Sequence, residues 1–226
     1  MAINKEKYFE LLSQLALRHA SVVAVSKTKP AEDILALYEL GQRDFGENYV
    51  QEMKEKRDLL PGDIRWHFIG HLQTNKVKQI APFVHLIHGI DTLKRMKETD
   101  RQAKKNDRII DILLQVHIAR ESTKFGMDET ELAEAIDAAP EFQNLRISGL
   151  MGMASFTDDQ NLVRSEFRFL KSLFDIYAVA AANGPQVSSF RILSMGMSDD
   201  YEIALEEGAN MIRIGSLIFG AREKTV

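Results

Sequence analysis

Short apolar segments alternate with amphipathic segments along the whole chain. Eight of them, rich in Val, Ile, Leu and Phe, have the composition of buried strands: Val22–Val25, Arg43–Phe45, Ile64–Ile69, Val84–Ile87, Ile109–Ile118, Leu145–Met151, Phe190–Leu193 and Met211–Ile214. Helical segments lie between them: Glu32–Leu40, Glu47–Leu59, Thr74–Ile80, Thr92–Asn106, Glu129–Ala138, Asn161–Ala182 and Asp200–Glu207. Strands that alternate with helices predict a parallel sheet covered by helices.

Eight strand–helix units in 226 residues predict an α/β fold, a single (β/α)8 TIM-type barrel over residues 1–226. A doubly wound open sheet is the alternative, although such a sheet needs only about five or six strands. Residues 1–20 are expected to form an N-terminal helix before the first strand, because Tyr8, Leu11 and Leu15 recur at helical spacing. No Pro/Gly/Ser-rich linker, internal repeat or low-complexity segment divides the chain.

The composition narrows the classes of function. Hydrophobic residues make up 45% and charged residues 27%, as in ordinary globular proteins. The net charge of −4 offers no basic footprint for nucleic acid. The charged start of the chain is unlike a secretory signal, and no apolar run approaches the ~20 residues of a membrane helix. We therefore expect a cytoplasmic protein. The absence of cysteine excludes disulfides, thiolate metal sites and a cysteine nucleophile.

The first strand leads into a lysine. In the segment VVAVSKTKP, strand alternation places Val23, Val25 and Lys27 on one face. At the inner end of a barrel strand, Lys27 would be partly desolvated, which lowers the pKa of a lysine and frees its amine as a nucleophile. The alternative is an ordinary lysine that extends to solvent. Lys29 precedes Pro30 and is expected in a loop.

The loops after the seventh and eighth strands carry groups that suit an anion. Ser198 and Asp199 stand where the N-cap of the next helix is expected, and Gly215 and Ser216 end the last strand. Barrels frequently bind phosphate at these two loops. The alternative is ordinary turn chemistry, which uses the same residue types.

Three further polar residues lie near strand ends. Arg213 shares its strand face with apolar neighbours, so it either forms a structural ion pair or faces a ligand. Asn48 and His67 either contact a ligand or serve as a turn residue and a core histidine. His85 and His88 lie in an apolar run without a carboxylate partner, so no metal site is expected.

A strand-end lysine and a phosphate site at one barrel mouth together suit a phosphorylated aldehyde such as pyridoxal 5′-phosphate (PLP). The chain also contains VAVSKTKP, FGENYVQE, WHFIGHLQTNK, GLMGMAS and SMGMSDDYEIALEEGANMIRIGSLIFGAR. In these motifs it closely resembles the pyridoxal phosphate homeostasis protein family over nearly its whole length. The resemblance implies a fold-type III PLP-binding barrel, related to the N-terminal domain of alanine racemase.

The resemblance also implies roles for particular residues. Lys27 would hold PLP covalently as a Schiff base, and Arg213 matches the arginine that faces the pyridine nitrogen in related racemases. Whether Arg213 contacts that nitrogen or the phosphate stays open. The other cofactor-binding residues implied are Asn48, His67, Ser194, Met195, Ser198, Gly215 and Ser216.

The function implied is that of a non-catalytic PLP carrier, a cytoplasmic monomer that holds PLP and delivers it to PLP-dependent apo-enzymes. Racemisation needs a base on each face of the substrate, and no second domain is expected here to supply one. A small amino-acid racemase or lyase is the alternative, with His67 as the other titratable group near neutrality. A phosphosugar aldolase or isomerase acting through the Lys27 amine is a third hypothesis.

Overall fold

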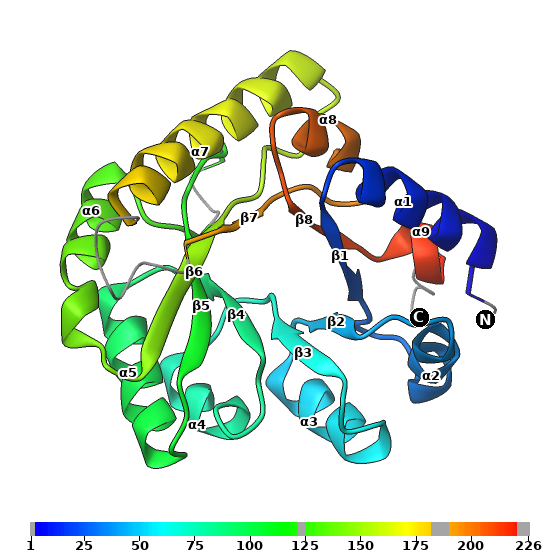
Figure 1. Ribbon diagram of the computed structural model, residues 1–226, viewed down its shortest axis with the longest axis horizontal. Helices are drawn as coiled ribbons and strands as arrows, with labels where there is room; N and C mark the ends of the chain where they lie inside the picture. The colour runs from blue at the N-terminus through cyan, green and yellow to red at the C-terminus, as the bar shows by residue number, and fades with distance from the viewer. Residues whose placement is uncertain (1–2, 122–124, 182–189, 221–226) are drawn as a thin grey trace.

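The fold is a closed barrel of eight parallel strands. The computed structural model describes residues 3–121, 125–181 and 190–220. The strands follow one another around the barrel in chain order, and the last pairs with the first (Figure 1). They are β1 (Ser21–Val25), β2 (Asp44–Glu47), β3 (Arg65–Phe68), β4 (Leu86–Ile90), β5 (Ile110–Gln115), β6 (Leu145–Met151), β7 (Ile192–Ser194) and β8 (Met211–Ile214). The predicted barrel is confirmed, and the open sheet is wrong.

Helices surround the strands on the outside of the barrel (Figure 1). They are α1 (Lys5–Leu17), α2 (Ala31–Glu39), α3 (Val50–Leu59), α4 (Val77–Ile80), α5 (Leu93–Lys105), α6 (Glu129–Asp137), α7 (Gln160–Ala181), α8 (Tyr201–Glu206) and α9 (Ser216–Phe219), with 3-10 turns η1 (Thr74–Lys76) and η2 (Ala139–Glu141). Helix α1 packs against β1 and α9, and its apolar face is buried. None of the described helices is long and apolar enough to cross a membrane.

Several boundaries differ from the sequence prediction. Glu47, expected to begin a helix, ends β2 instead, and α3 starts at Val50. Strand β4 lies further along the chain than predicted, and β5 stops at Gln115 rather than Ile118. Helix α7 was predicted to end at Ala182, which lies outside the described residues. The bounds of β6 and β8 are as predicted.

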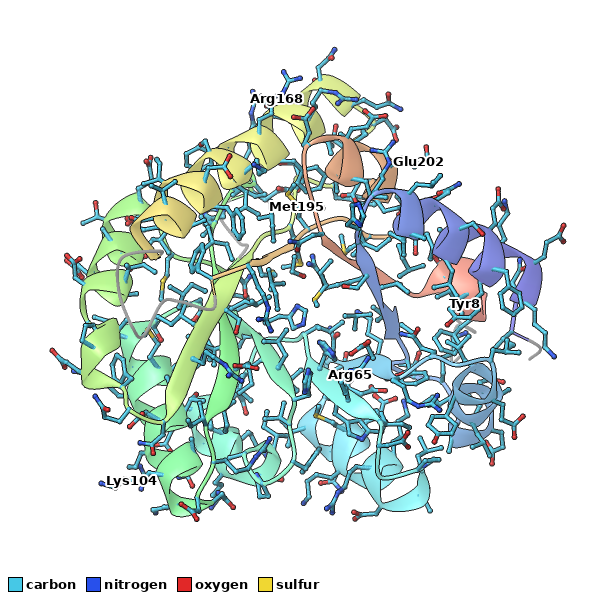
Figure 2. All side chains as sticks on the ribbon, in the orientation of Figure 1. Tyr8, Arg65, Lys104, Arg168, Met195 and Glu202 are labelled. Carbon is cyan, nitrogen blue, oxygen red and sulfur yellow. The ribbon has the colours of Figure 1, made fainter. Side chains whose placement is uncertain are left out.

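Two groups of side chains form the core. The larger apolar cluster lies mostly between the strands and the surrounding helices. A smaller cluster, Val23, Leu86, Leu113, Met151 and Met211, comes from strands on several sides of the barrel. Side chains fill the centre of the barrel (Figure 2). Polar side chains of β3, β4, β7 and β8 are also buried: His67, His88, Ser194 and Arg213. The barrel interior is therefore partly polar, and its polar part leads to the functional site.

Candidate functional site

A cavity of about 280 Å³ lies at the carboxyl ends of the strands. This size is near the lower end of the range for small-molecule sites, about 300–1,000 Å³. Six of the predicted site residues line it: Lys27, Asn48, Ser198, Arg213, Gly215 and Ser216. They come from the loops after β1, β2 and β7 and from β8 with the residues that follow it, so the fold brings together groups that are far apart in sequence.

Lys27 reaches the cavity from a turn. Strand β1 ends at Val25, as predicted, so the strand alternation used to place Lys27 does not extend to this residue. The turn closes through a hydrogen bond from the Lys29 amide to the Ser26 carbonyl (3.0 Å), and Thr28 has a φ of +63°. Lys27 itself is half-buried on the cavity wall. The turn therefore needs outside support to hold this left-handed conformation.

A buried ionic cluster supports the turn. The Lys56 ammonium donates to the Ser26 carbonyl (2.7 Å), to Glu47 Oε1 (2.8 Å) and to Glu52 Oε1 (2.7 Å). Glu52 also accepts the Thr28 amide at 2.5 Å. We call Ser26, Glu47, Glu52 and Lys56 the Lys56 clamp. It fixes the two residues that flank Lys27 by charge-assisted hydrogen bonds, which are stronger than neutral ones.

Glu47 is the most perturbed member of the clamp. Its side chain is fully buried, and burial raises its pKa to about 7, although the Lys56 ammonium opposes the shift. Its Oε1 accepts from Ser26 and Lys56, whereas its Oε2 has no hydrogen-bond partner in the described part of the chain. The clamp therefore carries a carboxyl group that changes charge near neutral pH.

Arg213 lies on β8 beside Val23 of β1 and is 4% exposed. Its Nη1 donates to Ser194 Oγ (2.8 Å) and its Nη2 to the Gly152 carbonyl (3.1 Å). Burial lowers its pKa to about 10, against the opposing charge of Asp200, so the group is cationic at neutral pH. No ion pair among the described residues involves Arg213. Within the described part of the chain, the alternative of a structural ion pair therefore finds no support, and Arg213 lines the cavity.

Ser198, Gly215 and Ser216 form another side of the cavity. Gly215 directly precedes α9, and amides in the first turn of a helix have no intrahelical acceptor. The expected N-cap at Ser198 or Asp199 is wrong, because α8 begins at Tyr201 and its N-cap is Asp200. The Asp200 carboxylate accepts the Met197 amide at 2.6 Å and so shapes this loop.

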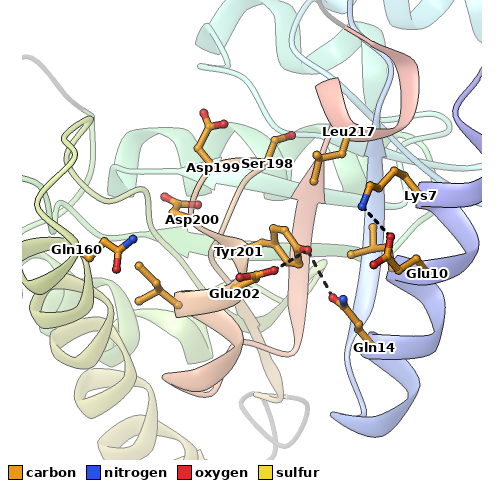
Figure 3. A pocket seen from close by; sticks show the side chains of 12 residues that line it. Lys7, Glu10, Gln14, Gln160, Ser198, Asp199, Asp200, Tyr201, Glu202 and Leu217 are labelled. Carbon is orange, nitrogen blue, oxygen red and sulfur yellow. Dashed lines mark hydrogen bonds and ion pairs between the residues drawn. The ribbon is translucent and has the colours of Figure 1, made fainter.

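A second cavity, of about 390 Å³, lies between α1 and α8 and shares Ser198 and Asp199 with the first (Figure 3). Its acidic lining residues are Glu10, Asp199, Asp200 and Glu202. Lys7, the cation that lines it, already pairs with Glu10 at 2.8 Å. A phosphate group suits the cavity of Lys27 and Arg213 better, because Lys29 also lines it and Asp199 is its acidic lining residue.

Asn48 follows β2 and approaches the backbone of Gly70. A Cβ on Gly70 would lie 2.4 Å from the Asn48 carbonyl oxygen, so only glycine allows this contact. Asn48 Oδ1 is buried and has no hydrogen-bond partner among the residues that the structure describes. A buried unpaired amide oxygen on a cavity wall is a ready acceptor for a ligand.

Three predicted residues do not line the cavity: His67, Ser194 and Met195. All are buried, with exposed fractions of 1%, 0% and 0%. Met153 and Met197 are the methionines that contribute to the cavity wall. A direct contact of the three buried residues with a cofactor stays a prediction.

Asp44 was missed by the sequence reasoning. Its carboxylate lies beside His67 and His85, with ligand atoms within 4.8 Å of one another. The expectation that His85 lacks a carboxylate partner is therefore wrong, because strand β2 brings Asp44 to it. His88 instead contacts His67 and Ser194. Arg65 already donates to both Asp44 oxygens, at 2.6 and 2.5 Å. That the chain holds no metal stays a prediction.

Comparisons with known proteins give the family. The profile described as "Alanine racemase, N-terminal domain" matches residues 6–223. The pyridoxal phosphate homeostasis protein of Aquifex aeolicus is 40% identical over 209 residues, 90% of this chain and 88% of that protein. That of Escherichia coli K12 is 37% identical over 207 residues, 90% and 86% of the two chains.

Solved structures agree with the sequence matches. PipY from Synechococcus elongatus with PLP bound superimposes with a TM-score of 0.84 at 33% identity, covering 95% of this chain and 99% of that one. Alanine racemase from Bartonella henselae shares the fold, with a TM-score of 0.67 at 16% identity, covering 96% of this chain and 59% of that one. The chain therefore belongs to the pyridoxal phosphate homeostasis protein family, within the larger family of alanine racemase N-terminal domains.

Proposed function

We propose that this protein binds PLP at the barrel mouth, holds it covalently through Lys27 and takes part in PLP homeostasis without amino-acid turnover of its own. The observation that carries the proposal is that Lys27 and Arg213 line one cavity. Ser198 and Ser216 line the same cavity. Relatives that carry the name of PLP homeostasis, and the PLP-bound PipY structure, support it.

Different residues of the cavity would bind different parts of PLP. PLP supplies an aldehyde, which condenses with a lysine amine and releases one water. Lys27 would provide that amine, while Ser198, Gly215 and Ser216 offer hydroxyl and amide donors for the phosphate. Arg213 only donates hydrogen bonds. Facing the pyridine nitrogen, it would keep this nitrogen unprotonated and make the ring a weak electron sink.

The non-catalytic part of the proposal rests on the positions of His67 and Tyr49, the titratable candidates for a second base. His67, the histidine considered for that role, is enclosed between Asp44 and His88 and does not line the cavity. Tyr49 is 59% exposed and also lies outside the cavity lining. No observation favours the racemase, lyase or phosphosugar alternatives over the carrier.

The binding test is a visible-absorbance titration of the purified protein with PLP, followed by borohydride reduction. We expect a yellow complex and a reduced adduct in the wild type, and neither in Lys27→Ala. Lys29→Ala is the matched control, because Lys29 lines the same cavity and donates to the Phe219 carbonyl at 3.0 Å. A yellow, trappable complex in Lys27→Ala would overturn the assignment of the lysine. A colourless wild type whose visible absorbance does not change when PLP is added would favour a phosphosugar enzyme.

The carrier role is tested by turnover and transfer. The PLP-loaded protein is mixed with D- and L-alanine or serine, and with a PLP-dependent apo-enzyme. We expect turnover no faster than with free PLP, and reactivation of the apo-enzyme. Robust racemisation would contradict the carrier role. The proposal includes a monomeric state and a cytoplasmic location, which size-exclusion chromatography and cell fractionation test.

A further inference from the structure

Hydrogen bonds cross the barrel interior from the amino-terminal end of β2 to the cavity. Asp44 Oδ1 lies 3.0 Å from His67 Nε2, and His67 Nδ1 lies 3.0 Å from His88 Nε2. His88 Nδ1 lies 3.1 Å from Ser194 Oγ, which accepts from Arg213 Nη1 at 2.8 Å. We call these five residues the interior chain. Each link joins side chains of different strands, so the chain depends on the closed barrel.

The chemistry of the end groups gives the chain a direction. Burial would raise the pKa of Asp44, but hydrogen bonds from Arg65 and His67 outweigh it and hold that pKa well below its usual range. An ionised carboxylate only accepts, so His67 Nε2 carries the hydrogen that it shares with Asp44. At the other end a guanidinium only donates, so Ser194 Oγ accepts from Arg213 and its own hydrogen is free for His88.

When both imidazoles are neutral, hydrogen bonds are donated in the same direction along the whole interior chain. Burial, together with the nearby positive charge of Arg213, keeps the pKa of His88 well below its usual value. Ser194 then donates to His88 Nδ1, and His88 Nε2 donates to His67 Nδ1. Every donor meets an acceptor from Arg213 to Asp44, with no unpaired nitrogen along the way.

The surroundings explain what the chain does for the guanidinium. Arg213 is a buried cation without an ion pair among the described residues, and a buried charge without partners is costly. At the other end of the interior chain, the Asp44 carboxylate accepts a hydrogen bond from the Arg65 guanidinium. The ring centre of His85 lies 5.3 Å from that of His67. Polarised hydrogen bonds in a low-dielectric interior reinforce one another along such a chain.

We propose that Asp44, His67, His88 and Ser194 are positioning residues for Arg213: they hold its guanidinium in one orientation toward the bound ligand through a chain of neutral imidazoles, each protonated on Nε2. This inference rests on the proposed PLP function. It also accounts for two residues of the family motifs, His67 and Ser194, that do not line the cavity.

The first test needs no ligand. Long-range ¹⁵N–¹H NMR of histidine-labelled protein at about pH 7 distinguishes the two neutral tautomers from imidazolium. We expect Nε2–H tautomers for both His67 and His88. An Nδ1–H tautomer at His88, or an imidazolium at either residue, would overturn the proposed direction. Because the protein is ligand-free, this result does not depend on whether PLP binds.

The second test asks whether the chain acts as one unit. Ser194→Ala removes the hydroxyl that links Arg213 to His88. It should weaken PLP binding about tenfold, the factor expected for a lost hydrogen bond to a charged group. It should also shift the visible band of bound PLP. His67→Gln should shift the band in the same direction, whereas His85→Gln, outside the chain, should leave band and affinity unchanged.

The double variant Ser194→Ala/His67→Gln separates positioning from simple structural support. If His67 acts through Ser194, the double variant binds PLP as Ser194→Ala does, because the path is already cut. If the losses of PLP affinity of the two single variants multiply in the double variant and the visible band does not shift, the two residues only support the fold. That result would overturn the inference. Failure of the wild type to bind PLP would instead overturn the proposed function, while the tautomer result stands.

Discussion

The two cationic walls of the cavity are held in opposite ways. On the Lys27 wall, the Lys56 clamp joins an ammonium to two carboxylates, Glu47 and Glu52, within one α/β unit. On the Arg213 wall, one guanidinium is held by a serine hydroxyl and a backbone carbonyl, and the nearest carboxylate of its hydrogen-bond chain lies at the other end of the barrel.

One small cavity can therefore combine a wall whose supporting charges change near neutral pH with a wall whose charges do not. The clamp contains a carboxyl group with a pKa raised to about 7, so its charge changes near neutrality. The Arg213 wall ends in groups that keep their charge there, because the Asp44 pKa is lowered and that of Arg213 is about 10. We therefore expect pH to act on the support of Lys27 before it acts on Arg213.

The largest effect is expected where the clamp is broken outright. Lys56→Met leaves two carboxylates facing each other without their cation, and breaking a buried ion pair on one side costs about 3–5 kcal/mol. Urea unfolding should show this loss in the free energy of unfolding. Lys54→Met on the same helix is the control, since Lys54 makes only a 3.5 Å contact with Gln79. Equal stability of the two variants would contradict the clamp.

Glu47→Gln should change how stability depends on pH. Because the folded pKa of Glu47 is raised from 4.5 to about 7, the folded state holds its proton more tightly than the unfolded chain. The stability that this proton contributes is present below about pH 4.5 and is lost as pH rises through about 7. Relative to Glu47→Gln, the wild type should therefore lose about 3 kcal/mol over this interval.

Urea unfolding of both proteins at about pH 5 and about pH 8 measures this difference. The comparison cancels the opposite contribution of Asp44, whose lowered pKa adds stability that is lost only in stronger acid. A stability difference between the two proteins that stays constant with pH would show that Glu47 does not titrate in this range.

A smaller effect is expected at the loop of Asn48. In Gly70→Ala, the new Cβ would meet the Asn48 carbonyl at 2.4 Å and its Cα at 2.8 Å, so this loop must move. We expect a loss of about 1–3 kcal/mol in stability, as for other overpacked sites, with weaker PLP binding. Gly62→Ala is matched, because no atom lies within 4 Å of its Cβ. Unchanged binding in Gly70→Ala would separate Asn48 from the site.

The smallest effect on stability is expected on the Arg213 wall. Arg213→Met removes a costly buried cation but also leaves the Ser194 hydroxyl and the Gly152 carbonyl without this donor. Because the two effects oppose each other, we expect a net change of about 1 kcal/mol. PLP affinity should nevertheless fall, measured by the same absorbance titration. A loss of stability as large as that of Lys56→Met would mean that both walls are held alike.

Much of the fold was predictable because apolar runs mark strands that are covered on both sides. β6 and β8 begin and end with apolar residues, and their bounds match the prediction. β4 was misplaced because its second half contains His88 and Gly89, and an apolar criterion cannot recognise a polar side chain that faces the barrel interior. Glu47 was assigned to a helix because its buried partner, Lys56, lies nine residues later and one element further on.

The candidate site was predictable where it depends on strand ends. Lys27, Arg213 and Ser216 follow from the rule that function gathers at the carboxyl ends of barrel strands. The interior chain was not predictable, because His88 and Ser194 are 106 positions apart and meet only when the barrel closes. Likewise, nothing near His67 in sequence indicates Asp44, which lies 23 positions earlier on a neighbouring strand.

The central claim, that Lys27 is the covalent handle of a PLP site, is tested most directly by a peptide map. Wild-type protein is loaded with PLP, reduced with borohydride, digested and analysed by tandem mass spectrometry. We expect one modified peptide, with the pyridoxyl group on Lys27. A modification on Lys29 or another lysine in its place, or no modification at all, would contradict the account.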